Sequence, residues 1–182
     1  MTKINKEINK EVNKEVNKEV NKEVEQKFTS AGTSINKTKL PASTKKINWD
    51  LYRGKKVLDV GGGKFDNLKD YLKGEYDIDL YVYDKFNRSE EENTKALRIE
   101  PSLVICNNVL NVISENEIVE GLVRFIEGYG VDYVVSIYEG NRSGEGKASK
   151  KDCYQRNERV GEYVRFFKDG AEVRKGMIMN KR

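Results

Sequence analysis

An acidic residue and three glycines stand together where a short apolar run ends. In the stretch VLDVGGGKFD, Asp59 lies inside the run, and Gly61, Gly62 and Gly63 follow it. Glycine lets a backbone approach a ligand closely and adopt positive φ. The dinucleotide-binding pattern G-x-G-x-x-G would need glycine at position 66, where Asp66 stands. An acid before the loop would repel a pyrophosphate, so the pattern favours a ligand with a cationic end.

A second acid, Asp84, ends the next apolar run, 25 residues after Asp59. An acid at that position can accept both hydroxyl groups of a ribose, and Phe86 just beyond it can pack against a base. The start of a helix after the glycines offers N–H groups to a carboxylate. S-adenosylmethionine combines an ammonium, a carboxylate, a ribose and an adenine, and we predict it as the ligand. The alternative is that Asp59 and the glycines form only a tight turn.

The elements that position these residues alternate between strands and helices. Buried apolar runs predict strands in KKVLDV, DLYVYD, PSLVICN and DYVVSIYE, and a last strand in AEVRKGMIM. The first helix is predicted in FDNLKDYLKG, with Gly74 as its stop. This rhythm predicts an α/β domain with a doubly wound, mostly parallel sheet, whose ligands bind beyond the carboxyl ends of the strands.

Three more helices follow from spacing and capping. The pairs Ser89/Glu92 and Ser114/Glu117 have the spacing of capping boxes, so a helix is expected after each. Apolar residues at helical spacing predict another helix over residues 154–168.

Three stretches together resemble a known family. VLDVGGGKFD, YVYDKF and VICNNVLNVI are similar to the motifs of the class I S-adenosylmethionine-dependent methyltransferases, over roughly residues 50–182. The chain also resembles small methyltransferase-like proteins of phages and mobile elements. The resemblance implies a Rossmann-like methyltransferase sheet in which Asp84 holds the ribose and Asn107 and Asn108 lie beside the methyl group. It also implies that the methionine part is cradled by Asp59, Gly61, Gly62 and Gly63.

The chain departs from that family in two respects. Only 16 residues separate Asp84 from Pro101. The family usually places a helix and a further strand there, and that strand carries an acid that binds the adenine amine. This chain has room for the helix alone, so one edge of the sheet is expected to be shortened. The chain also lacks the Pro-Pro-aromatic and Pro-Cys motifs of DNA methyltransferases, and Cys106 is expected to be buried.

A long polar stretch, YEGNRSGEGKASKKDCYQRN, follows the fourth predicted strand on the ligand side. We predict a mobile substrate loop that grips an anionic acceptor, such as a nucleotide, a nucleic acid or a phosphate-bearing small molecule. An ordinary solvated loop is the alternative. The candidate substrate-binding residues are Arg142, Lys147, Gln155 and Asn157.

Candidate catalytic residues lie at the start of the same stretch and after the third strand. Methyl transfer is an in-line displacement in which positioning supplies much of the catalysis. The chain has no histidine, so Glu139 is the candidate general base and Tyr138 the next. Asn108 is placed to orient an acceptor amine or hydroxyl.

The N-terminal region repeats a four-residue unit, INKE or VNKE, over residues 4–24. With about 3.6 residues per helical turn, an apolar residue every four positions drifts around the helix. Residues 1–28 are therefore interpreted as a repetitive tail, helical or disordered, or alternatively as a helix that associates with copies of itself. Residues 29–50 are interpreted as a linker or lid anchored by Trp49, and residues 51–182 as the methyltransferase-like domain.

Composition excludes several classes of site. Charged residues make up 35% of the 182, with a net charge of +4, which does not by itself indicate a nucleic-acid-binding protein. The absence of histidine excludes histidine-based catalysis and histidine metal ligands. Cys106 and Cys153 lack metal-site spacing, so no metal is expected and both read as reduced thiols. No apolar run has the length of a membrane span or signal peptide, so we expect a cytoplasmic protein that does not engage membranes.

These observations leave three hypotheses. The first is a methyltransferase that acts on an anionic acceptor. The second is a non-catalytic module that binds S-adenosylmethionine or a related nucleotide, with an assembly or regulatory role. The third is a binder of NAD-type nucleotides, which the missing glycine at position 66 disfavours.

Overall fold

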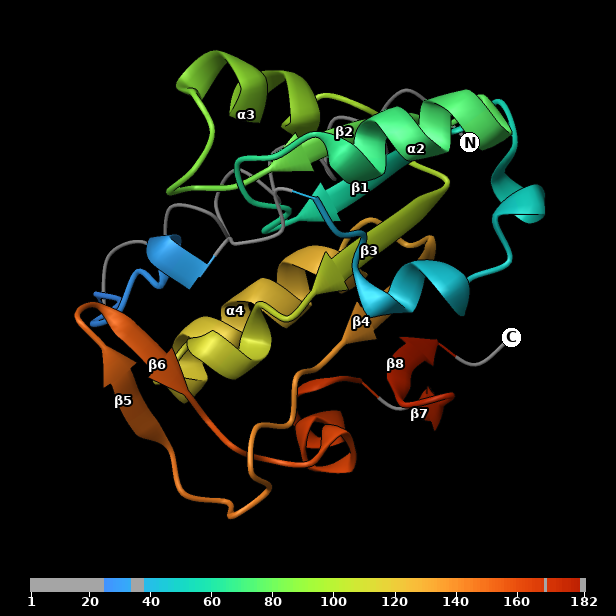
Figure 1. The fold of residues 1–182 in the computed structure, drawn as a ribbon. Coiled ribbons are helices and arrows are strands. Elements are labelled where there is room, and N and C mark those ends of the chain that lie inside the picture. Colours follow the sequence, from blue (N-terminus) through green and yellow to red (C-terminus); the bar gives the residue numbers. More distant parts are fainter. Residues whose placement is uncertain (1–24, 34–37, 169, 181–182) are drawn as a thin grey trace, which may run out of the picture.

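The computed structural model describes residues 25–33, 38–168 and 170–180 (Figure 1). The predicted repeat, residues 4–24, lies outside these residues. The described part is a mixed α/β structure around a six-stranded sheet in the order β2-β1-β3-β4-β8-β7. The strands are β1 (Lys56–Val60), β2 (Asp79–Tyr83), β3 (Leu103–Asn107), β4 (Asp132–Ser136), β7 (Ala171–Arg174) and β8 (Met177–Asn180). Strands β1 to β4 run parallel, whereas β8 is antiparallel to both β4 and β7.

Helices cover both faces of this sheet, as the apolar runs predict. Alternate residues of β1 point to opposite faces: Val57 joins a core with Leu68 and Leu72, whereas Leu58 joins a second core with Val119. The first face carries α2 (Asn67–Tyr76) and the 3-10 turn η3 (Trp49–Tyr52). The second carries α3 (Glu90–Leu97), α4 (Asn116–Glu127) and the 3-10 helix η5 (Val160–Phe166). Each aliphatic side chain buried in this way contributes roughly 1.5–3 kcal/mol.

The edge of the sheet at β2 is short, as the spacing between Asp84 and Pro101 predicts. The chain leaves β2, forms α3 and enters β3 directly. Among the described residues, β2 pairs only with β1. The α3 capping box is also confirmed: Ser89 Oγ accepts from the Glu92 N–H at 3.2 Å, and the Glu92 carboxylate accepts from the Ser89 N–H at 2.9 Å.

Other predicted boundaries are wrong. Helix α2 runs through Gly74 and ends at Tyr76, because Asp77 takes the left-handed conformation that closes it. Helix α4 begins at Asn116 without a side-chain cap, because Ser114 Oγ donates instead to Glu115 Oε1 at 2.6 Å.

The C-terminal third differs most from expectation. The helix predicted over 154–168 is only the short η5, because residues 153–155 form strand β6 (Cys153–Gln155), which pairs with β5 (Lys147–Lys150). The stretch expected to be a single last strand is a hairpin, since Lys175 and Gly176 both have positive φ between β7 and β8. Two central residues with positive φ are typical of the tightest hairpin turns.

The segment before β1 is packed against the domain. Trp49 is 3% exposed and belongs to the same core as Leu68 and Leu72, which confirms it as an anchor to the domain. Residues 25–33, drawn in blue in Figure 1, lie beside the β5–β6 hairpin, where the Ser30 N–H donates to the Asp152 carbonyl at 2.9 Å. In the described part of the chain, no helix has both the length and the apolar character needed to cross a membrane.

Candidate functional site

A cleft of about 1490 Å³ lies at the carboxyl ends of the parallel strands. Its volume exceeds the roughly 300–1,000 Å³ of ordinary small-molecule sites, so it has room for two ligands side by side. Every predicted cofactor-binding residue lines it: Asp59, Gly61, Gly62, Gly63, Asp84, Phe86 and Asn107. Asn108 lines it as well. The sequence therefore identified residues that the fold brings together.

Asp59 is a buried carboxylate on the floor of this cleft. It is 3% exposed, and its Oδ1 has no hydrogen-bond partner among the described residues. Burial raises the pKa of the Asp59 carboxyl from its usual 3.8 to about 7; the charge of Asp84 adds to the rise, and that of Arg88 opposes it. A buried charge without a partner is costly. The site therefore favours a proton or a cationic group at Asp59.

The glycines form a cradle that only glycine allows. A Cβ at Gly61, where φ is +74°, would stand 2.4 Å from Val109 Cγ2. A Cβ at Gly62 would stand 2.5 Å from Asp59 Oδ2. A side chain at either position would therefore displace the wall of the cleft or cover the carboxylate of Asp59.

Asp84 ties the glycine loop to the loop that follows β2. Its Oδ2 accepts from the Gly63 N–H at 2.8 Å. Its Oδ1 accepts from the N–H groups of Phe86 at 3.0 Å and Asn87 at 2.9 Å, and from Asn87 Nδ2 at 3.1 Å. Since each carboxylate oxygen has about two acceptor positions, Oδ2 retains one for a ligand hydroxyl and Oδ1 retains none. A ribose grip that uses both oxygens of Asp84 is therefore not available in this arrangement.

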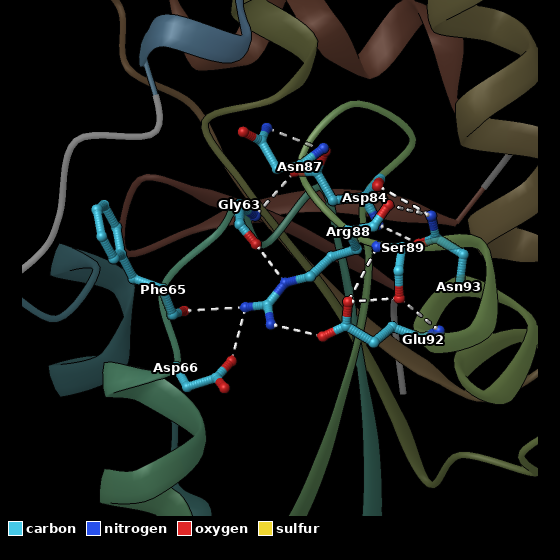
Figure 2. A network of polar contacts seen from close by, with 9 residues as sticks. All are labelled: Gly63, Phe65, Asp66, Asp84, Asn87, Arg88, Ser89, Glu92 and Asn93. Carbon is cyan, nitrogen blue, oxygen red and sulfur yellow. Dashed lines mark hydrogen bonds and ion pairs between the residues drawn. The ribbon is translucent and has the colours of Figure 1, made fainter.

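Arg88, which the sequence analysis did not identify, holds the glycine loop from the other side (Figure 2). Its side chain is 7% exposed, and Nε donates to the Gly63 carbonyl at 2.7 Å. Its Nη2 lies 2.7 Å from Asp66 Oδ1, and its Nη1 lies 3.2 Å from Glu92 Oε1. The Ser89 N–H and hydroxyl, and then Arg88, lower the pKa of Glu92 to about 2. The network fixes the loop before any ligand binds.

Asn93 completes this network, and it too was missed. Its Oδ1 accepts from the Asp84 N–H at 2.8 Å, and its Nδ2 donates to the Asp84 carbonyl at 3.1 Å. The backbone of Asp84 is thus held by α3 while the carboxylate of Asp84 holds the glycine loop. Asn93 and Arg88 bind largely to backbone atoms. Because every residue has the same backbone atoms, no pair of residue types at a fixed spacing reveals such contacts in the sequence.

Asn107 stands at the end of β3 with one polar atom unused. Its Oδ1 accepts from Ser43 Oγ at 2.5 Å and from Ser136 Oγ at 2.9 Å. Its Nδ2 is buried without a partner among the described residues. Asn108 is exposed with a φ of 57°, and its N–H donates to the Ser136 carbonyl at 2.9 Å. Asn107 therefore offers the cleft a donor.

Glu139, the candidate base, is occupied elsewhere. Its Oε1 accepts from the Val160 N–H at 2.8 Å, and its Oε2 pairs with Arg142 Nε at 2.7 Å. The Val160 hydrogen bond and then Arg142 hold the pKa of the Glu139 carboxyl below its usual range, despite an opposing effect of burial. Neither Glu139 nor Arg142 is among the described residues that line the cleft. Tyr138 does line it and is 62% exposed.

The polar stretch after β4 contains the β5–β6 hairpin, which the sequence analysis did not predict. Of the predicted substrate-binding residues, Lys147, Gln155 and Asn157 line the cleft. Asn157 is 8% exposed: its Nδ2 donates to the Glu145 carbonyl at 2.9 Å, and its Oδ1 accepts from the Asn141 N–H at 3.3 Å. Asn157 therefore has a structural role that accounts for both ends of its amide.

Residues before β1 form another wall of the cleft. Phe28 stacks on Tyr154 with ring centroids 5.3 Å apart, and Ser30 Oγ donates to the Val112 carbonyl at 3.2 Å. The lining residues of this wall are Glu25, Gln26, Thr29, Ser30, Thr33, Lys39 and Pro41. Within this wall, Thr29 and Ser30 are hydrogen-bonded to Asp152 and Tyr154 of the β5–β6 hairpin.

Comparison of the chain with family models, with curated proteins and with solved structures gives no match. The function is therefore argued from the site alone.

Proposed function

We propose that this protein is an S-adenosylmethionine-dependent methyltransferase with a Rossmann-like class I fold, acting on an anionic acceptor. The observation that carries the proposal is the Asp59 carboxylate, buried and without a partner for Oδ1, on the floor of a glycine cradle. An ammonium group is the ligand feature that satisfies it, because a cation compensates a desolvated carboxylate and an anion does not.

The surrounding residues fit the other parts of the same ligand. Asp84 Oδ2 has one acceptor position left for a ribose hydroxyl. Asn107 Nδ2 is an unused donor, which suits a carboxylate. Phe86 is 40% exposed at the cleft and suits a flat base. The missing strand beyond β2 means that the adenine amine meets no acid from such a strand.

The residues expected near the acceptor are consistent with a methyl transfer that is catalysed mainly by positioning of the two reactants. S-adenosylmethionine supplies a methyl group made electrophilic by the sulfonium. Because Glu139 is engaged with Val160 and Arg142, we assign it no proton transfer. Positioning of two reactants can lower a barrier by about 7–11 kcal/mol. Lys39 and Lys147 line the cleft and suit an anionic group on the acceptor.

Calorimetric titration of the full chain tests the proposal. We expect S-adenosylmethionine and S-adenosylhomocysteine to bind, because both carry the ammonium group, and NAD not to bind. Asp59→Asn should bind S-adenosylmethionine only weakly. Asp79→Asn is the matched control, because Asp79 begins β2 at the opposite end of the sheet and is paired with Lys73. Equal affinity of parent and Asp59→Asn for S-adenosylmethionine would refute the assignment.

A non-catalytic module that binds the same ligand is the second candidate. The engagement of Glu139 away from the cleft favours it, since this leaves Tyr138 as the candidate base that lines the cleft. Incubation with methyl-labelled S-adenosylmethionine and a panel of nucleotides separates the two, because only the enzyme releases S-adenosylhomocysteine in proportion to an added acceptor.

A further inference from the structure

Two amide side chains that line the cleft, those of Gln155 and Asn111, have their orientation fixed by one backbone carbonyl. Gln155 Nε2 donates to the Tyr138 carbonyl at 2.9 Å. A carbonyl only accepts, so the oxygen of Gln155 must face the other way, where it accepts from Asn111 Nδ2 at 3.0 Å. The amide of Asn111 therefore has no freedom to flip, and its oxygen is turned away from Gln155.

That oxygen is an acceptor without a donor. Asn111 is 2% exposed and lines the cleft, and its Oδ1 is buried with no partner among the described residues. Asn157, in the same wall, uses both ends of its amide. An unpaired buried acceptor costs about 1–3 kcal/mol. Whereas the amide oxygen of Asn157 accepts a hydrogen bond within the protein, that of Asn111 does not. We infer that Asn111 Oδ1 accepts a hydrogen bond from an N–H or O–H group of a ligand.

Two further groups converge on Gln155. Lys147 is its direct partner across the β5–β6 pair, so both side chains stand on one face with Cβ atoms about 4.5–5.5 Å apart. Tyr138, whose carbonyl Gln155 holds, has a 62% exposed side chain that lines the same cleft. Gln155 therefore has three neighbours that line the cleft. They supply an acceptor oxygen (Asn111), an ammonium group (Lys147) and an exposed aromatic ring (Tyr138).

We propose that Asn111, Tyr138 and Lys147 form the acceptor subsite, and that it binds a nucleotide whose base carries an exocyclic amino group. This inference rests on the proposed function and names its acceptor. The amino group donates to Asn111 Oδ1, the base packs on the Tyr138 ring, and Lys147 pairs with the phosphate. An uncharged amide oxygen suits an uncharged amino group, whereas a buried ammonium would require a carboxylate. Stacking of a base on an aromatic side chain contributes about 1–3 kcal/mol.

The test compares nucleotides with and without an exocyclic amino group: GMP has one that IMP lacks, whereas AMP and CMP have one where IMP and UMP have an oxo group beside a ring N–H. With S-adenosylhomocysteine present, AMP and GMP are titrated against IMP, and CMP against UMP. We expect at least one amino-bearing nucleotide to bind tenfold or more tightly than its partner. Asn111→Leu should remove that preference and leave S-adenosylmethionine affinity unchanged. Asn180→Leu is the matched control, because Asn180, at the end of β8, uses both ends of its amide with Tyr133 and Val131.

Lys147→Gln supplies the second arm. It should weaken AMP binding and leave adenosine binding unchanged, because only AMP carries the phosphate. Titration with single-stranded oligonucleotides distinguishes a nucleic-acid acceptor from a free nucleotide. For a nucleic acid, each phosphate contact adds about −0.7 to the slope of the logarithm of the binding constant against the logarithm of salt concentration. For a free nucleotide this slope is shallow. Equal affinities in all three comparisons, AMP with IMP, GMP with IMP and CMP with UMP, would overturn the inference. This outcome is measured on the parent protein and does not depend on the folding of a variant. If S-adenosylmethionine still binds in that case, the proposed function survives without this subsite.

Discussion

The charge state of Asp59 gives a pH dependence that can be worked out in advance. With a pKa of about 7, Asp59 is ionised in about 3% of molecules at pH 5.5 and in about half at pH 7.0. Only the ionised form offers a charge to an ammonium group. The affinity for S-adenosylmethionine should therefore rise roughly fifteenfold between these pH values. The ligand's amino group keeps its own charge in this window, because α-amino groups titrate near 7.7–8.0.

Calorimetric titration at half-unit steps of pH measures this dependence. An ordinary exposed aspartate would be ionised throughout, so its contribution would not change. Asp59→Asn should bind weakly at every pH and should show none of the rise. A flat profile in the parent protein would refute the argument that a desolvated carboxylate receives the ligand's cation.

The raised pKa of Asp59 also affects the stability of the ligand-free protein. This stability should fall with rising pH, whereas the affinity for S-adenosylmethionine should rise. The unfolded chain releases the Asp59 proton near pH 3.8, whereas the folded chain keeps it until about pH 7. The free energy of unfolding should therefore fall as pH rises through that window, by at most about 1.4 kcal/mol per unit and about 4 kcal/mol in all. Asp59→Asn should be more stable than the parent at pH 7.5 in urea denaturation, and the difference should vanish below pH 4.

Two further predictions concern the glycine loop. Gly62→Ala should abolish S-adenosylmethionine binding in calorimetry, because its Cβ would stand 2.5 Å from the Asp59 carboxylate; retained affinity would show that the ligand does not approach there. Arg88→Met should lower the free energy of unfolding by about 1.5–3 kcal/mol, because the buried guanidinium is bonded to the Gly63 carbonyl. The exposed Arg53→Met is its control and should change stability by less than about 1 kcal/mol.

The sheet could be predicted because strands covered on both faces are apolar throughout. The β3 residues 103–106 are all buried, and they stand together in the sequence as LVIC. The glycines and Asp84 could be predicted because a strand end followed by glycine has a local pattern. The turn at Lys175 and Gly176 was missed, since apolar residues stand at every second position both before and after it and were interpreted as one strand.

The rest of the site depends on contacts that residue spacing does not reveal. Arg88 reaches a carbonyl 25 positions earlier in the chain, and carbonyls are present at every residue. Glu139 was assigned as a base from its place after a strand, but the backbone N–H of Val160, 21 residues later, takes one of its oxygens. Asn111 drew no attention, because only the folded chain shows that its oxygen lacks a donor.

The charges in the two halves of the cleft correspond to different stages of the proposed reaction. Methyl transfer removes the positive charge from sulfur, so the carboxylates of Asp59 and Asp84 interact best with the ligand before transfer and contribute to binding, not to rate. An acceptor amine gains positive charge as the new bond forms, so its N–H becomes a stronger donor to Asn111 Oδ1 in the transition state. Interactions that strengthen in the transition state raise kcat. Asn111→Leu should therefore lower kcat by more than it raises KM for the acceptor, whereas Lys147→Gln should mainly raise KM.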